Sequence, residues 1–400
     1  MNFQHLMPEC DLFFGENTLS EVGRITKEWG DNILLVTGKN SMRELGFLDE
    51  ALESIEKEGL RCTLYDEVEP NPRVDIVDQG IEVARKNGCD VIIALGGGSS
   101  IDTAKAIAVG VAHFPQSGGT IWSFVDTGDK ERKIGGITSK TLPIVAVTST
   151  SGTGSHVTPF SVVTQVLTHE KIGFSSKYMF PKASVVDLRI VSKMSRSLTA
   201  ATGIDVLTHA TESFLGRGQH PSADLFSLKA INLVAENLPK VCENGGNMEA
   251  RSNMAFADTL AGWTITLAGT ILGHALVHPI GGYYNSAHGA ALSAITPYIW
   301  NFLIECNNQK ILDKFVYIAQ ALGERVSLPG TKDKAKMAVN VLEALLEKIG
   351  LTKKLSDYGV DKSMIEILAK DALRYGIVDL DRTPVKVTLK DLIGILQESI

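Results

Sequence analysis

The chain has 400 residues, of which 44% are hydrophobic, and its 39 lysines and arginines against 46 aspartates and glutamates give a net charge of −7. The length predicts two domains, and the acidic balance argues against a nucleic-acid partner, which would require a basic surface. The five cysteines lack a Cys-x-x-Cys pair, so we expect reduced thiols. The first residues show no basic segment followed by an apolar run, so we expect no signal peptide and a cytoplasmic location.

Alternating strands and helices are predicted for the first half of the chain. Short apolar runs predict strands at residues 33–37, 61–65, 91–95 and 144–147. Apolar residues at helical spacing predict helices at residues 45–58, 74–86 and 101–109. Continuous apolar strands separated by helices are typical of a parallel sheet covered on both faces. We therefore predict an α/β domain over residues 1–188.

Helical patterns dominate the second half, and strand signals fade from about Thr199. The predicted helices cover residues 222–238, 250–268, 309–322 and 334–349. We therefore predict an all-helical domain over residues 189–400. The segment 259–277 has no Asp, Glu, Lys or Arg and is long enough to span a bilayer. No cluster of basic residues flanks it, so we interpret it as a buried helix and expect no membrane association.

A glycine-rich stretch separates the strand at 91–95 from the next helix. Glycines there let the backbone approach an anion closely, and the helix N-terminus offers N–H donors. A second loop, 148–155, contains only hydroxylated residues and glycines and follows the strand at 144–147. Ligands bind at this edge of α/β sheets, so the two loops together predict a dinucleotide, although a tight turn remains the alternative for the first. The candidate contacts are Gly96, Gly97, Gly98, Ser99, Asp102, Ser149, Thr150 and Thr153.

The end of the first predicted strand bears on which dinucleotide is bound. A carboxylate there would bind the ribose 2′-hydroxyl and repel a 2′-phosphate. After Gly38, no carboxylate occurs before Glu44. Lys39 and Arg43 could neutralise a 2′-phosphate, and Ser41 could hydrogen-bond it. This favours NADP(H) with NAD(H) as the alternative, although a solvated basic turn would have the same sequence.

Histidines and one aspartate recur at helical spacing in the second half. Asp205 and His209 are four residues apart, which places both on one face of a helix. His274 and His278 have the same spacing, and His288 follows after a loop. Imidazoles with one carboxylate suit Fe²⁺ or Zn²⁺. Spacing alone does not separate His278 from the others, and a buried histidine without a ligand role is the alternative for each.

Together these stretches resemble the iron-containing (group III) alcohol dehydrogenase family over essentially the whole chain. The similar stretches are Gly96–Ser99 with Asp102 and Lys105, residues 150–155, residues 199–205 with His209 and Glu212, and residues 274–288. The resemblance implies a nucleotide-binding α/β domain followed by a helical metal-binding domain. It implies that the metal ligands are Asp205, His209, His274 and His288. It leaves His278 for proton transfer near the substrate, and it places Lys171 near the cofactor ribose.

The resemblance also implies the reaction. A metal-dependent enzyme of this type transfers a hydride reversibly between a small or primary alcohol and NAD(P), and the metal acts as a Lewis acid on the substrate oxygen. Fe²⁺ is the expected metal and Zn²⁺ the alternative. The expected partners are an alcohol or aldehyde substrate and a second copy of the chain, in a homodimer or higher homo-oligomer.

The sequence departs from the family pattern at four positions. Ser100 and Leu188 stand where the family commonly has proline, and His156 stands where it commonly has glutamate. Gly38 stands where NAD-dependent members have a discriminating aspartate, which again favours NADP(H).

Three other functions are alternatives for a sequence of this type. A glycerol dehydrogenase-like enzyme would use fewer protein ligands on zinc, so the fourth ligand candidate argues against it. A dehydroquinate synthase-like lyase would require a basic pocket, and the permanent cations between residues 205 and 290 lie outside the ligand motifs, at Arg217, Lys229, Lys240 and Arg251. A non-enzymatic binding protein is disfavoured by the intact ligand set.

Overall fold

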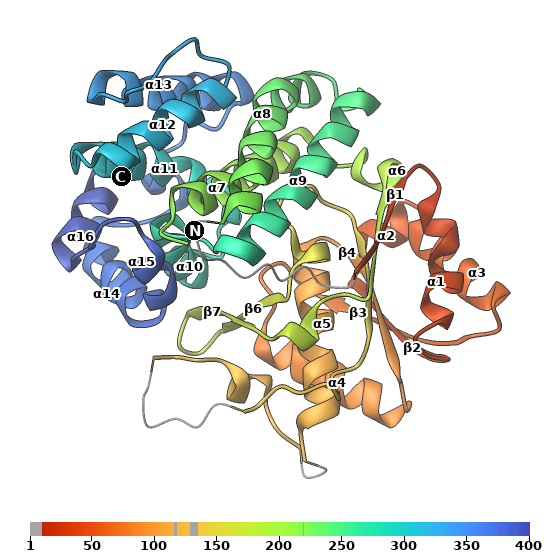
Figure 1. Cartoon of the computed structure of the whole chain (residues 1–400). Coiled ribbons are helices and arrows are strands. Elements are labelled where there is room, and N and C mark those ends of the chain that lie inside the picture. Colours follow the sequence, from red (N-terminus) through yellow and green to blue (C-terminus); the bar gives the residue numbers. More distant parts are fainter. Residues whose placement is uncertain (1–9, 116–117, 129–134, 219) are drawn as a thin grey trace. The chain divides into compact units, whose positions relative to one another are not determined.

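The computed structural model describes residues 10–115, 118–128, 135–218 and 220–400. The described residues form two compact units, one ending at Met194 and the other running from Ser195 to Ile400 (Figure 1).

A parallel six-stranded sheet forms the centre of the first unit. Its strand order is β1-β8-β5-β4-β2-β3, and every neighbouring pair is parallel, as predicted. The strands are β1 (Asp11–Gly15), β2 (Asn32–Gly38), β3 (Arg61–Val68), β4 (Val91–Gly96), β5 (Ile144–Thr148) and β8 (Ala183–Asp187). The outer strand β1 and its neighbour β8 were not predicted. Because all strands are parallel, their carboxyl ends lie along one edge of the sheet.

Helices cover both faces of this sheet. Alternate residues of a strand point to opposite faces, so Ile33 and Leu35 pack with Leu48 and Ile55, whereas Leu34 is buried on the other face. The first face is covered by α1 (Val22–Lys27) and α3 (Phe47–Lys57), and the second by α4 (Val74–Lys86) and α5 (Gly98–His113). The shorter elements of this unit are α2 (Ser41–Glu44), α6 (Leu188–Val191), η1 (Thr18–Glu21), η2 (Ile121–Phe124), η3 (Ser155–Val157) and η4 (Lys177–Met179).

An antiparallel hairpin, β6 (Phe160–Gln165) and β7 (Glu170–Ser175), follows the polar loop after β5. It packs against α5 and was not predicted. Along the chain, the loop 148–155 therefore connects β5 of the main sheet to this second, two-stranded sheet.

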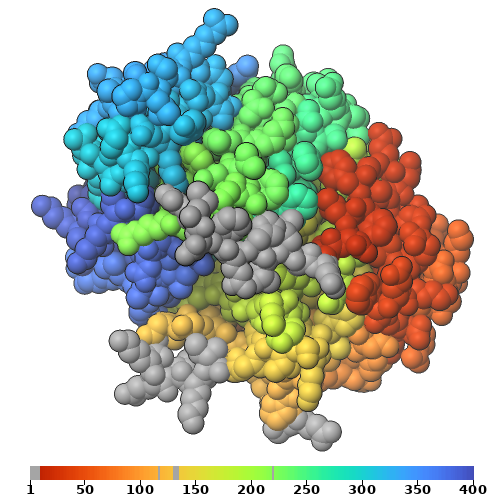
Figure 2. Space-filling model, in the orientation of Figure 1, coloured from red at the N-terminus to blue at the C-terminus, as the bar shows by residue number. Residues whose placement is uncertain are grey.

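The second unit is all-helical, as predicted. Its helices are α7 (Arg196–Leu215), α8 (Pro221–Glu243), α9 (Met248–Ala268), α10 (Leu272–Tyr284), α11 (His288–Glu305), α12 (Gln309–Ala321), α13 (Lys332–Ile349), α14 (Ile365–Tyr375), α15 (Ile377–Arg382) and α16 (Leu389–Glu398), with short turns η5 (Leu355–Tyr358) and η6 (Lys362–Met364). The fully buried Trp300 of α11 packs on Phe315 of α12 in the core. At the surface, the cyan and light-blue residues of α12 and α13 adjoin the green residues of α8 (Figure 2).

The charge-free segment 259–277 is largely buried, as predicted, but it is not one helix, so the prediction of a single helix was wrong. Helix α9 ends at Ala268, Gly269 has a φ of 76°, and α10 begins at Leu272 after a bend of 107°. Ser213 Oγ donates a hydrogen bond to the Gly269 carbonyl at 2.9 Å, which helps to fix the bend. Among the described residues, no single helix is long and apolar enough to cross a membrane, although the bent pair meets that test by length and composition.

Candidate functional site

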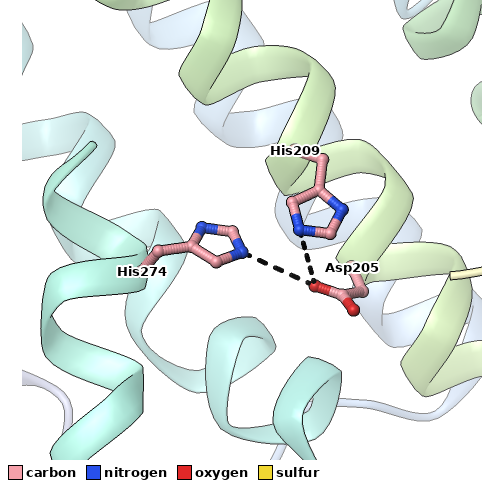
Figure 3. Close-up of side chains that lie close together, drawn as sticks. All are labelled: Asp205, His209 and His274. Carbon is pink, nitrogen blue, oxygen red and sulfur yellow. Dashed lines mark ion pairs between the residues drawn. The ribbon is translucent and has the colours of Figure 1, made fainter. Parts of the chain in front are cut away.

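Three candidate metal ligands converge from two helices of the second unit. Helix α7 begins after Ser195, whose side chain accepts a hydrogen bond from the backbone N–H of Leu198. One helical turn separates Asp205 from His209 on this helix. Figure 3 shows both imidazoles, His209 from α7 and His274 from α10, pointing at the Asp205 carboxylate. Ligand atoms of these three buried residues lie within 4.8 Å of one another.

The imidazoles present the same ring nitrogen to one oxygen atom. Asp205 Oδ1 lies 3.8 Å from His209 Nε2 and 3.8 Å from His274 Nε2. His288, the first residue of α11, places its Nε2 3.7 Å from the same oxygen. The rings of His209 and His274 are stacked, with centroids 4.6 Å apart. Four side chains from three helices therefore surround one point.

The chemistry of this point suits a divalent cation. Asp205 Oδ1 and His274 Nε2 are buried and have no hydrogen-bond partner among the described residues, since their separation of 3.8 Å is too long for a hydrogen bond. Burial lowers the pKa of His274, but Glu212 and then Asp205 raise it to about 10 overall. The carboxylates thus stabilise positive charge here. A bound Fe²⁺ or Zn²⁺ would supply that charge and satisfy both atoms.

Glu212 also contacts this cluster, although it was not among the predicted site residues. Its Oε2 accepts a hydrogen bond from the Ile271 backbone N–H at 2.7 Å and lies 3.0 Å from His274 Nδ1. An ionised carboxylate only accepts, so Nδ1 carries a proton, and a bound metal ion would displace the second proton and take the lone pair of Nε2. Glu212 lies three residues after His209, on the same helical face, so this spacing could have identified it.

His278 lies one turn after His274 on α10 but is set apart from the convergent nitrogens. Its ring centroid is 6.3 Å from that of His274 and 5.7 Å from that of His288. The group of described ligand atoms within 4.8 Å of one another includes His274 and does not include His278. The group thus separates the two histidines of α10 that spacing alone treats as equal, and His288, which also lies outside it, joins the ligand candidates through its Nε2 distance of 3.7 Å from Asp205 Oδ1.

The two loops predicted to bind a dinucleotide lie side by side in the first unit. Gly96 ends β4, and Gly98 begins α5. Cβ atoms added to Gly97 and Gly98 would lie 3.0 Å from Thr150 Cγ2 and 2.6 Å from Thr153 Cγ2. Ser149 of the second loop donates its backbone N–H to the Gly96 carbonyl at 2.9 Å, and Ser99 lies in the first turn of α5. Glycine therefore keeps the helix N-terminus uncapped and closely packed, as anion binding requires.

Buried polar groups of α5 hold the loop 148–155 against this helix. The Asp102 carboxylate accepts hydrogen bonds from Ser155 Oγ at 2.6 Å and from the Val162 backbone N–H at 2.9 Å. Lys105 Nζ donates to Ser155 O, Ser155 Oγ and Phe160 O at 2.7–2.8 Å. Burial lowers the pKa of Lys105 to about 8 and raises the pKa of Asp102. Asp102, expected to contact the cofactor, thus has both carboxylate oxygens bonded inside the protein.

The remaining predicted cofactor contacts lie in the same unit. Gly38 ends β2 at the same edge of the sheet as the glycine turn, followed by Lys39 and by Ser41, the first residue of α2. Lys171 on β7 donates from Nζ to Asn71 Oδ1 at 2.6 Å.

Comparison with known proteins places both units in one family. The family model described as iron-containing alcohol dehydrogenase matches residues 9–188. A second model, described as the C-terminal part of the Fe-containing alcohol dehydrogenase family, matches residues 199–400.

Individual relatives match over nearly the whole chain. The NAD-dependent methanol dehydrogenase of Bacillus methanolicus is 31% identical over 386 residues, covering 96% of this chain and 97% of the relative. The NADPH-dependent butanol dehydrogenase of Clostridium saccharobutylicum is 31% identical over 369 residues, covering 91% and 90%. The crystal structure of an archaeal halo-thermophilic alcohol dehydrogenase from a Red Sea brine pool superposes with a TM-score of 0.97 at 43% identity, covering 100% of this chain and 99% of that one.

Proposed function

Because the chain belongs to the iron-containing alcohol dehydrogenase family, we propose that it transfers a hydride reversibly between a small primary alcohol and NAD(P), with the aldehyde as the other product. The observation that supports this most strongly is the convergence of three imidazole Nε2 atoms on Asp205 Oδ1. In the reduction direction the same enzyme acts as an aldehyde reductase.

Four side chains are proposed as the metal ligands: Asp205, His209, His274 and His288. Fe²⁺ is the proposed metal and Zn²⁺ the alternative, because both accept nitrogen and oxygen ligands. The bound ion would supply Lewis-acid polarisation of the substrate oxygen. Glu212 would hold His274 in the tautomer that leaves Nε2 free for the ion.

We assign proton transfer to His278. Its ring lies 5.7 Å from the ring of His288 and 6.3 Å from the ring of His274, two of the proposed ligands. An imidazole that is free of metal can take up or release a proton near neutral pH. Residues 1–188 are proposed to bind the dinucleotide and residues 189–400 to carry the metal and the catalytic chemistry.

The proposed cofactor is NADP(H), with NAD(H) as the alternative. Family membership leaves this open, since the two relatives described above are named for different cofactors. Support for NADP(H) comes from Gly38, which leaves the end of β2 without a carboxylate, and from Lys39 and Ser41 beside it. The pyrophosphate is assigned to Gly96–Ser99 with the loop at Ser149, Thr150 and Thr153.

We further propose a cytoplasmic homodimer or higher homo-oligomer. None of the five cysteines forms a disulfide, which fits a protein of a reducing compartment. Sedimentation of the purified enzyme measures its oligomeric state.

Steady-state kinetics test the function. Rates with NADPH and NADH on short-chain aldehydes are measured in the enzyme as purified, after chelation, and after Fe²⁺ or Zn²⁺ is restored. We expect chelation to abolish turnover and metal to restore it. Full activity in an enzyme shown by elemental analysis to be metal-free would contradict the proposal.

A further inference from the structure

The turn after β2 lies beside the glycine turn, where the adenosine ribose of a bound dinucleotide is expected. Strand β4 is in register with β2 through Leu95 and Thr37, at the residue before the glycine turn. On the other side of β2, Gly38 is in register with Val68 at the end of β3. The residues that flank Val68 in the chain therefore lie beside the turn that carries Lys39.

Acidic side chains from this neighbouring strand already pair with the basic residues of the turn. Lys39 Nζ lies 3.1 Å from Glu67 Oε2 and 3.7 Å from Glu69 Oε1. The Arg43 guanidinium lies 2.7 Å from the Asp66 carboxylate. The hydrogen bond that Lys39 donates to Glu67 raises the pKa of Lys39. A turn that is basic in sequence thus has two cations facing three carboxylates when folded.

We propose that Glu67 and Glu69 are specificity residues, which compete with the 2′-phosphate of NADP(H) for Lys39 and so weaken the preference for NADP(H) that Lys39 confers. The inference rests on the proposed function, because it concerns the dinucleotide assigned to this unit. Exposed ion pairs contribute little free energy, so a phosphate can displace a carboxylate from Lys39. The displaced carboxylates then repel the phosphate, whereas NAD(H) has no charge at this position.

The turn itself does not impose selectivity by its shape. A Cβ atom added to Gly38 would meet only the Val68 carbonyl oxygen, at an ordinary contact distance of 3.5 Å. The space at the end of β2 is therefore open. The charges at and just after the end of β3, rather than a side chain on β2, therefore set how strongly NADP(H) is preferred here.

The experiment compares kcat/KM for NADP⁺ and NAD⁺ with one alcohol in the metal-loaded enzyme. We expect E67Q/E69Q to raise the NADP⁺/NAD⁺ ratio about 10-fold at low salt, since two repulsive charges are removed. Lys39→Gln should lower the ratio. The matched control is Glu21→Gln, because Glu21 is 49% exposed and paired with Arg24, much as Glu67 is 50% exposed and paired with Lys39.

The outcomes separate this inference from the proposed function. A ratio that rises in the double variant, stays at the wild-type value in the control and returns towards it at high salt supports the inference. A ratio within about two-fold of wild type in E67Q/E69Q, with turnover intact, overturns the specificity role alone. Absence of turnover with either cofactor in the metal-loaded wild type overturns the proposed function and the inference with it.

Discussion

Glu212 accepts a hydrogen bond from Nδ1 of His274 at 3.0 Å, and the same carboxylate oxygen accepts the Ile271 backbone N–H. One side chain therefore orients a proposed metal ligand and holds the start of the helix that carries it. An added Cβ at Gly273 would lie 2.1 Å from Glu212 Oε1, so the glycine is what lets the carboxylate approach.

Replacing Glu212 with glutamine should weaken metal binding about 10- to 100-fold, because an amide no longer fixes the His274 tautomer by charge. Gly273→Ala should act in the same direction by displacing the carboxylate. Competition with a chromogenic chelator measures the affinity. The control is Glu236→Gln, an exposed glutamate of α8 that is bonded to Asn232. Unchanged affinity in the Glu212 variant would show that the hydrogen bond does not tune the site.

His209→Ala and His278→Ala should fail in different ways. Loss of a ligand should leave the His209 variant with little bound metal. The His278 variant should keep nearly stoichiometric metal and lose about 10²- to 10⁴-fold in turnover, the usual contribution of a general acid or base. Elemental analysis and kcat are measured on both proteins. Metal loss from His278→Ala would show that the ligands are misassigned.

Acid should destabilise the protein through His156. This imidazole is buried, and desolvation, with repulsion from Lys105, lowers its pKa from 6.5 to about 3. The unfolded chain takes up a proton below pH 6.5 and the folded chain does not, so stability falls as the pH drops from 6.5 towards 3. Between pH 7 and pH 5 the loss should be about 2 kcal/mol.

Urea unfolding at both pH values measures this loss. His156→Gln should reduce the difference between the two pH values, whatever its effect at pH 7. His169→Asn, in the exposed turn after β6, is the control and should behave as wild type. An equal acid loss in the His156 variant would assign the sensitivity to other groups.

Lys105→Met should cost about 3–5 kcal/mol of unfolding free energy, because it leaves the buried Asp102 carboxylate without its cation. Lys86→Met, at an exposed position of α4, should change little. Adding Asp102→Asn to the Lys105 variant should recover part of the loss. Strictly additive effects in this double-mutant cycle would show that the two groups are not coupled.

The central strands and the longer helices were predictable because their signals are local. Strands β2, β4 and β5 are continuous buried apolar runs, and α3 and α4 carry apolar residues at helical spacing. Strands β1 (DLFFG) and β8 (ASVVD) are as short as β5 (IVAVT), but polar or small residues at their ends interrupt the continuous apolar run that identifies β5. At the break between α9 and α10, Ser213 donates a hydrogen bond to Gly269 and Glu212 accepts one from Ile271, from more than fifty residues away, while the apolar composition continues through the break.

In the candidate site, too, the features with a local signal were predictable and those that depend on packing were not. The spacing of Asp205 and His209 predicted a shared helical face, and the structure brings them together. Whether His274 or His278 joins them depends on how α10 packs, which spacing does not contain. The pairing of Lys39 with Glu67 is likewise a contact between neighbouring strands, so the turn looked basic when read along the chain.

The packing of Gly98 against Thr153 has a consequence for how the two loops can change over time. A Cβ at position 98 would overlap the threonine methyl, so a larger residue there requires a smaller one at position 153. Natural evolution or laboratory selection that enlarges the residue at position 98 without changing position 153 should therefore give inactive proteins. Libraries that vary both positions together should recover functional pairs that single-site libraries miss.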